Sequence, residues 1–121
     1  MEGTGKKHWI FADGDLPPAG EAEPYGHEAL MIVNTGGVAV KCELTLYFED
    51  AEPKRGVAVD VGAERVRCVR LDQPLGEEGF KVPFGQYALE LKASAPVVAV
   101  FGRLDVRQNN LAYYPVQGFS C

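Results

Sequence analysis

The alternating charges at residues 103–107 are the first group in this sequence that could do chemistry. Arg103, Asp105 and Arg107 are separated by single residues, so on a β-strand they share one face at a spacing of roughly 6.6 Å. That spacing suits mutual ion pairing. The apolar residues at 97–101 precede them, so this face changes from apolar to charged, as at the mouth of a cleft. Ligand recognition is one interpretation, and a solvated strand end with surface ion pairs is the other.

A second polar group opens a strand after a loop rich in proline and glycine. His27 and Glu28 offer one imidazole and one carboxylate where a loop meets the scaffold, which is a common place for binding groups. The alternative is that both side chains lie on the surface without a ligand. Asn34 starts a tight turn at the end of the same run, where its tolerance of left-handed backbone favours a structural role.

Arginines are concentrated in one further strand. Arg65, Arg67 and Arg70, together with Arg103, would bring four guanidinium groups together if the two strands were adjacent. Guanidinium forks suit carboxylate, phosphate or sugar-hydroxyl ligands. Pairing of these arginines with acidic residues on neighbouring strands is an equally good interpretation.

Signatures of catalysis and of metal binding are missing from the sequence. There is no nucleophile elbow, phosphate loop or dinucleotide fingerprint. His8 and His27 are the two histidines, and a metal site usually needs three or four ligands. Cys42, Cys68 and Cys121 lack metal-ligand spacing, and an odd number argues against a disulfide framework. We therefore predict no enzyme activity, cofactor or metal, and reduced thiols, with Cys42 and Cys68 as small core residues.

Composition and charge narrow the class of protein. The 121 residues fit one domain, 1–121, and 46% of them are hydrophobic, which is ordinary for a globular chain. The net charge of −5 disfavours nucleic acid as a partner, because phosphate-backbone binders usually carry the opposite balance. No stretch approaches the roughly 20 apolar residues of a membrane span, and residues 1–7 do not resemble a signal peptide. We expect a cytoplasmic protein.

Short segments of alternating hydrophobicity, separated by turn residues, predict an all-β fold. The clearest is residues 40–49. Every even position there carries an apolar side chain, which at position 48 is aromatic, and the positions between are mostly polar. Residues 28–34 form an apolar run before it, and the two glycines in the linking segment 35–37 predict that the two segments pair as a hairpin. Further strands are expected at residues 9–12, 57–61, 64–71, 87–92, 97–107 and 111–116.

This count predicts an antiparallel β-sandwich of seven or eight strands, with an open barrel as the alternative. A turn at residues 93–96 should separate two of the strands. Residues 72–83 form the longest connection and are a candidate lid. Residues 97–101 are apolar on both faces, so one face should meet the opposite sheet and the other a second subunit. We therefore predict a homo-oligomer.

The ordered series of motifs resembles the sensory rhodopsin transducer family. An early Trp and a Gly-x-x-Pro-Pro turn precede a His-Glu pair that opens a strand ending in Asn. A Tyr-Phe-Glu-Asp-x-Glu-Pro segment, an arginine-rich strand and a Pro-Val-Val segment leading to Arg-Leu-Asp-x-Arg-Gln follow. These motifs are Trp9, residues 14–18, His27, Glu28, Asn34, residues 47–53, residues 65–70 and residues 96–108.

The resemblance implies a cytoplasmic β-sandwich-like domain that assembles as a homo-oligomer, a tetramer, with a polar pocket for a small molecule such as a sugar. Some members of the family are soluble partners of a microbial rhodopsin. Two functions are therefore open: a non-catalytic sensory domain that binds a small molecule, or a transducer that docks on a membrane photoreceptor or another receptor. The ligand residues implied by the resemblance are His27, Glu28, Asn34, Arg70, Arg103, Asp105 and Arg107.

Overall fold

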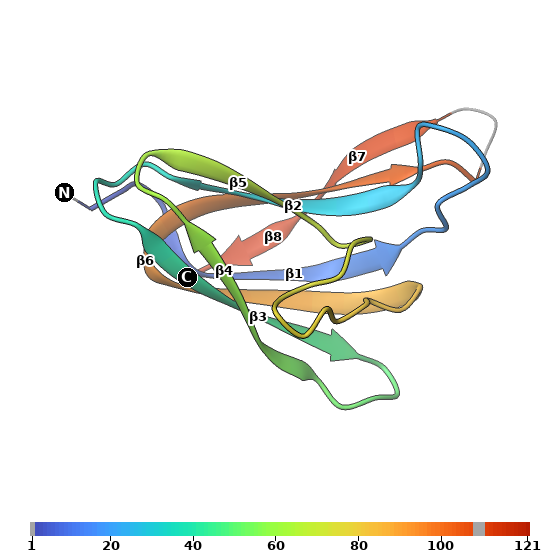
Figure 1. The fold of residues 1–121 in the computed structure, drawn as a ribbon, viewed down its shortest axis with the longest axis horizontal. Helices are drawn as coiled ribbons and strands as arrows, with labels where there is room; N and C mark the ends of the chain where they lie inside the picture. Colours follow the sequence, from blue (N-terminus) through green and yellow to red (C-terminus); the bar gives the residue numbers. More distant parts are fainter. Residues whose placement is uncertain (1, 108–110) are drawn as a thin grey trace.

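The computed structural model describes residues 2–107 and 111–121, and within them it contains eight β-strands and no helix (Figure 1). Every strand pairing is antiparallel. The all-β, antiparallel class predicted from the sequence is confirmed. The strands are β1 (Lys6–Leu16), β2 (His27–Asn34), β3 (Val40–Phe48), β4 (Lys54–Val61), β5 (Arg65–Arg70), β6 (Gly85–Asp105), β7 (Ala112–Val116) and β8 (Gly118–Ser120).

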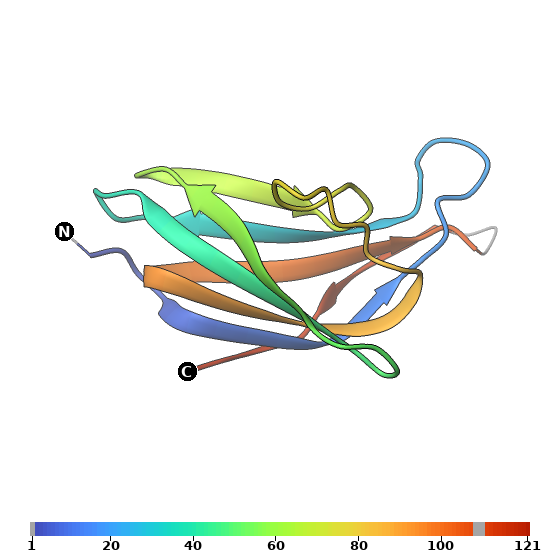
Figure 2. The same cartoon turned by 60° about the horizontal axis from the view of Figure 1, so that its bottom comes forward.

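The strands form two layers, which Figures 1 and 2 show one above the other. Sheet A has the order β4-β3-β6-β1-β8, and sheet B has the order β5-β2-β6-β7. Strand β6 belongs to both, because residues 87–93 pair with β3 and residues 98–104 pair with β2. The arrangement is that of a β-sandwich whose two sheets share one strand.

Two predictions about connections are wrong. The turn expected at residues 93–96 does not form, and β6 runs through it for 21 residues. This segment consists of small residues and a proline, which let an extended strand bend between sheets. The hairpin expected between β2 and β3 is also absent from the described residues, because β2 lies in sheet B and β3 in sheet A. Each strand has its own apolar face, and the sandwich places those faces opposite each other.

The core lies between the two sheets and consists of the inward side chains of nearly every strand. Its largest fully buried members come from β1, β2, β3 and β6 in addition to one residue after β5. They are Phe11, Phe101, Leu30, Ile32, Leu44, Leu46, Leu71, Leu89 and Leu91. Alternation along each strand places these residues on one face, which is why the period-two pattern was visible in the sequence.

The connection at residues 72–83 is part of this core rather than a free loop. Leu75 and Phe80 exchange two backbone hydrogen bonds of 2.8 and 2.9 Å, which close a small hairpin. Leu75 and Val82 are buried against the core. The segment between β5 and the start of β6 is therefore packed on the core, and its role as a lid stays a prediction.

Candidate functional site

A buried carboxylate, Glu28, lies at the centre of the polar groups inside the sandwich. Its side chain is 0% exposed. Oε2 accepts hydrogen bonds from Arg103 Nε at 2.8 Å and from the backbone N–H of Asp15 at 2.9 Å. Oε1 accepts a hydrogen bond of 2.7 Å from the hydroxyl of Tyr87. Burial and the neighbouring Glu28 charge raise the pKa of Tyr87 far above its usual range, so the hydroxyl stays a donor.

The Arg103 guanidinium is held on all three of its nitrogens. Besides the Nε contact to Glu28, Nη1 donates to the hydroxyl of Tyr114 at 3.1 Å and Nη2 donates to the carbonyl of Asp13 at 2.5 Å. The guanidinium carbon also lies 5.2 Å from the centre of the Tyr114 ring. Burial alone lowers the pKa of Arg103, but the hydrogen bonds to Tyr114 and Glu28 outweigh it and raise the pKa. The cation is therefore permanent, and each of its three nitrogens has a partner within the protein.

Strand register explains why these groups meet. Glu28 of β2 lies directly opposite Arg103 of β6, so their side chains project from the same face. Gly14 of β1 lies opposite Tyr87, and a Cβ at Gly14 would sit 2.8 Å from the Tyr87 ring. Glycine at this position lets the ring reach Glu28. The cluster therefore joins both sheets through β1, β2 and β6.

Two predictions about the charged motif are corrected by this geometry. Arg103 is 4% exposed, so it is buried inside the sandwich rather than placed at the mouth of a cleft. Its carboxylate partner is Glu28 on the neighbouring strand, not Asp105 on its own strand. Residues two apart on one strand are separated by roughly 6.6 Å, whereas directly opposed residues are closer. A role for Arg103 and Glu28 in ligand binding stays a prediction.

Asp105 and Arg107 form a separate, exposed pair just where β6 ends. Arg107 Nη2 lies 2.5 Å from Asp105 Oδ2, and the backbone N–H of Arg107 donates to Asp105 Oδ1 at 2.9 Å. The Arg107 side chain is 51% exposed. Hydrogen bonds donated by Arg107 hold the pKa of Asp105 below its usual range. The pair closes a local turn and faces water.

His27 and Arg70 lie together beside a surface cleft. Arg70 makes a two-point contact with Asp72, with Nε and Nη2 at 2.7 and 2.8 Å from the two carboxylate oxygens. His27 Nδ1 lies 2.8 Å from the carbonyl of Tyr25. A hollow of about 440 Å³ is lined by His27, Tyr25 and Arg70. A neighbouring cleft of about 610 Å³ adds Asp72 and Lys81.

Asn34 and the other arginines lie away from this cleft. Asn34 is 1% exposed; its Nδ2 donates to the carbonyls of Val38 and Gly62 at 2.9 and 3.1 Å, which ties two loops together. Asn34 therefore has a structural role through its side chain, whereas the left-handed backbone expected at this position is not found. Its implied part in ligand binding stays a prediction. Arg67 donates to the carbonyl of Asp60 at 2.9 Å. Strand β2 separates β5 from β6, so the four arginines considered in the sequence do not gather at one site.

The outer face of sheet B is apolar over three neighbouring strands. Val33 of β2 lies between Val66 of β5 and Val98 of β6, and Met31 lies between Cys68 and Val100 in the next row. We call these six residues the outer patch. Val66, Val98 and Val100 are 68%, 40% and 47% exposed. The prediction that β6 is apolar on both faces is confirmed, since Val97, Ala99 and Phe101 are buried on the inner side.

Cys68 contradicts its predicted place in the core. It is exposed, whereas Cys42 is buried as expected. Strand β5 carries Cys68 on the outer face, opposite Met31, because Val69 takes the inward position. Burial raises the pKa of the Cys42 thiol to about 11. All three cysteines are free.

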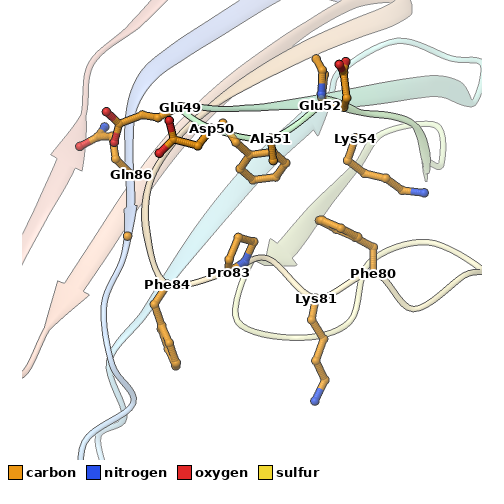
Figure 3. A pocket seen from close by; sticks show the side chains of 13 residues that line it. Glu49, Asp50, Ala51, Glu52, Lys54, Phe80, Lys81, Pro83, Phe84 and Gln86 are labelled. Atoms are coloured by element: carbon orange, nitrogen blue, oxygen red, sulfur yellow. The ribbon is translucent and has the colours of Figure 1, made fainter.

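A groove that the sequence reading missed lies between the β3–β4 turn and the segment before β6. We call it the aromatic groove; it has a volume of about 750 Å³. Phe48 and Phe80 pack with ring centroids 6.3 Å apart at its floor. In Figure 3, Phe80 and Pro83 face the turn across the groove, while Phe84 projects outward and is 75% exposed. The sequence carried one signal for this groove: Phe48 and Phe84 lie at the ends of two loops that contain proline and glycine.

The aromatic groove is lined by three carboxylates and by the two ammonium groups of Lys54 and Lys81. The turn supplies three carboxylates, those of Glu49, Asp50 and Glu52 (Figure 3). Lys54 lies 5.6 Å from the centre of the Phe80 ring, and its ammonium is paired with Glu78 at 2.9 Å. The groove therefore combines an apolar floor, an exposed phenylalanine and a negative rim.

Comparison with known proteins places the chain in a family. The family model described as Anabaena sensory rhodopsin transducer matches residues 4–120. The chain therefore belongs to the Anabaena sensory rhodopsin transducer family. No curated protein matches the chain at a significant level. Among the described residues, no helix is long and apolar enough to cross a membrane.

Two solved structures are similar over most of this chain. The crystal structure of Thermotoga maritima 1070 is 29% identical, with a TM-score of 0.82, and the match covers 96% of this chain and 95% of that one. The Anabaena sensory rhodopsin transducer is 30% identical, with a TM-score of 0.71, and the match covers 82% of this chain and 95% of the transducer. Family membership confirms the resemblance seen in the motifs.

Proposed function

We propose that this protein is a non-catalytic signalling domain that docks on the cytoplasmic side of a membrane receptor, a photoreceptor in the first instance. Membership of the transducer family supports this function. The internal charges support it as well, because the guanidinium of Arg103 and the carboxylate of Glu28 are occupied by protein partners. Three free cysteines fit a reducing compartment such as the cytoplasm.

The aromatic groove is the observation that carries this proposal. Cytoplasmic loops of membrane proteins carry an excess of lysine and arginine. The carboxylates of Glu49, Asp50 and Glu52 provide the complementary charge, and Phe84 provides an exposed aromatic anchor. The net charge of −5 attracts the same kind of surface at longer range.

Titration against a microbial sensory rhodopsin in lipid nanodiscs tests the proposal. Binding should weaken as salt is raised, because the rim charges are exposed. Phe84→Ala and Glu52→Lys should each abolish most of the binding. Phe119→Ala is the matched control, because Phe119 is 67% exposed on β8 and lies outside the groove. Equal binding by Phe84→Ala and Phe119→Ala would remove the groove from the proposal.

Assembly through the outer patch is a second part of the proposal. An exposed apolar surface that spans three neighbouring strands of a sheet, here β5, β2 and β6, supports a protein interface. A flat, self-complementary patch suits an isologous contact between two copies of the chain. The tetramer implied by the family resemblance would need one further contact. The outer patch and the aromatic groove share no residue, so self-association leaves the groove free for a receptor.

Small-molecule binding is the second candidate function, and the cleft beside Arg70 favours it. Pockets for small ligands combine apolar walls with a few polar groups. Here Tyr25 supplies an aromatic wall, while Arg70, Asp72 and Lys81 supply polar groups. A thermal-shift screen of sugars and other polar metabolites tests this function, since a ligand that binds the folded state raises its stability. A hit that survives Arg70→Ala would exclude this cleft.

A further inference from the structure

A thiol, an imidazole and a carboxylate form a chain on the outer face of sheet A. The sulfur of Cys121 lies 3.2 Å from Nδ1 of His8, and Nε2 of His8 lies 2.5 Å from Oε2 of Glu90. The other carboxylate oxygen of Glu90 accepts a hydrogen bond from the hydroxyl of Tyr47. A backbone hydrogen bond of 3.0 Å from Cys121 N–H to the His8 carbonyl fixes the distance between the two side chains.

The order of these contacts sets the tautomer of the imidazole. The hydrogen bond from Tyr47 holds the pKa of Glu90 below its usual range, and the contact with His8 contributes to the same effect. Glu90 is therefore an ionised acceptor for the proton on Nε2. The lone pair of a neutral imidazole then lies on Nδ1, and it faces the sulfur of Cys121. Cys121 is therefore placed as a nucleophile, His8 as its base and Glu90 as the group that orients the base, which is the arrangement of activated thiols generally.

Neither of the other thiols has this environment. Cys42 is buried, and the raised pKa of its thiol disfavours the reactive thiolate. Cys68 is exposed, but no hydrogen bond to its sulfur occurs among the described residues. His27, the second histidine, contacts the carbonyl of Tyr25 instead of a thiol. Cys121 alone combines exposure with an imidazole.

We propose that Cys121 is a site of thiol–disulfide exchange with low-molecular-weight disulfides, with His8 as the proton acceptor and Glu90 as its positioning residue. The Cys121 thiol proton moves to Nδ1 of His8, and the sulfur forms a bond to one sulfur of the disulfide. The disulfide bond breaks, and its second sulfur leaves with the electron pair and takes the proton from the imidazolium. The products are a mixed disulfide on Cys121 and one free thiol. A reducing thiol reverses the exchange.

This site shares no residue with the aromatic groove or with the outer patch. His8 and Glu90 lie on the outer side of sheet A, whereas the outer patch lies on sheet B. Oxidation would replace a small thiol with a bulkier group at the β1–β8 edge and would leave the buried cluster in place. The exchange therefore modifies the protein in a redox-dependent way without removing the contacts that hold the fold.

The rate of reaction with the aromatic disulfide 5,5′-dithiobis(2-nitrobenzoate) tests the proposal. Cys121→Ser and Cys68→Ser variants assign the kinetic phases of the folded protein. All rates are measured in the Val98→Asp background, so that self-association through the outer patch does not cover Cys68, and Cys68 serves as an internal reference for exposure. We expect Cys121 to react on the order of tenfold faster than Cys68. His8→Gln should reduce the rate of Cys121 to that of Cys68, and Glu90→Gln should reduce it in part. The Cys68 rate should stay constant in both variants.

Oxidised glutathione provides the physiological counterpart, with mass spectrometry as the readout. A single adduct of glutathione on Cys121, removed by dithiothreitol, is the expected product. Equal rates for Cys121 and Cys68, or a Cys121 rate unchanged in His8→Gln and in Glu90→Gln, would overturn the proposal.

Discussion

Two ion pairs involve residues of the segment 103–107, and they differ in burial, in partners and in role. Arg103 pairs with Glu28 inside the sandwich, where their side chains are 5% and 0% exposed. Arg107 pairs with Asp105 at the strand end, where their side chains are 51% and 16% exposed. Arg103, Asp105 and Arg107 appear in the sequence as alternating charges, whereas Glu28 lies 75 positions away from Arg103. The comparison shows that spacing along a strand determines which face of the sheet a charged side chain occupies. Its burial and the residue opposite it on the neighbouring strand determine which ion pair it forms and how much that pair contributes to stability.

Arg103→Ala should produce the largest effect. It leaves the carboxylate of Glu28 buried without its cation, which costs about 3–5 kcal/mol of unfolding free energy. Urea unfolding monitored by circular dichroism measures the loss. Arg107→Ala is the matched control, and its midpoint should stay close to that of the original protein, because exposed ion pairs contribute little. Similar, small losses in both variants would show that Arg103 does not support the fold.

Val98→Asp extends the comparison to the two faces of β6. The inner face is buried whatever the assembly state, whereas the outer patch needs a partner to exclude water. A charge placed in an apolar interface is costly, so Val98→Asp should convert the proposed oligomer to monomer while the chain stays folded. Light scattering at micromolar concentration measures the mass. Val38→Asp is the control, since Val38 is 72% exposed in a loop outside the patch. A monomeric original protein would contradict assembly.

Tyr87→Phe probes the neutral member of the buried cluster. It removes one hydrogen bond to Glu28 and leaves a carboxylate oxygen unsatisfied in the interior, which costs about 1–3 kcal/mol. Chemical denaturation again provides the measurement. Tyr47→Phe is the comparison on the outer face of sheet A, where water can replace the lost contact. Equal stabilities for the two variants would mean that the hydroxyl of Tyr87 contributes nothing.

The smallest effect concerns the titration of Asp105. Hydrogen bonds from Arg107 hold its pKa below the unfolded value of about 3.9. The pair therefore contributes stability above the unfolded pKa, and that contribution is lost as the pH falls through the folded pKa. NMR titration of the Asp105 carboxyl should show a low pKa that rises in Arg107→Ala. An unchanged pKa in Arg107→Ala would show that the pair is not formed in solution.

Strand content could be predicted because a half-buried strand repeats its pattern every two residues. The same pattern also identified residues 97–101 as apolar on both faces. Pairing between strands was harder, because the bend in β6 at residues 93–96 depends on where the second sheet lies. The local sequence predicted a turn at residues 93–96 and a hairpin between β2 and β3, and both predictions were wrong.

The candidate site was predictable only in part. Glu28 and Arg103 were singled out as chemical residues, but their direct contact depends on β2–β6 register, which is not encoded locally. The aromatic groove joins residues more than thirty positions apart, such as Phe48 and Phe84. The contact of Cys121 with His8 spans 113 positions. Contacts of this kind follow from the fold, and no spacing rule in the sequence reveals them.

The most direct test of the account compares an interior variant with a surface variant in a single experiment. Tyr87→Phe and Phe84→Ala are each titrated against sensory rhodopsin in nanodiscs, and their thermal unfolding is recorded in the same buffer. The account predicts that Phe84→Ala keeps its melting temperature and loses binding, whereas Tyr87→Phe loses stability and binds normally while it is folded. The reverse result, with binding lost in folded Tyr87→Phe and retained in Phe84→Ala, would contradict the claim that the buried cluster holds the fold and the groove meets the receptor.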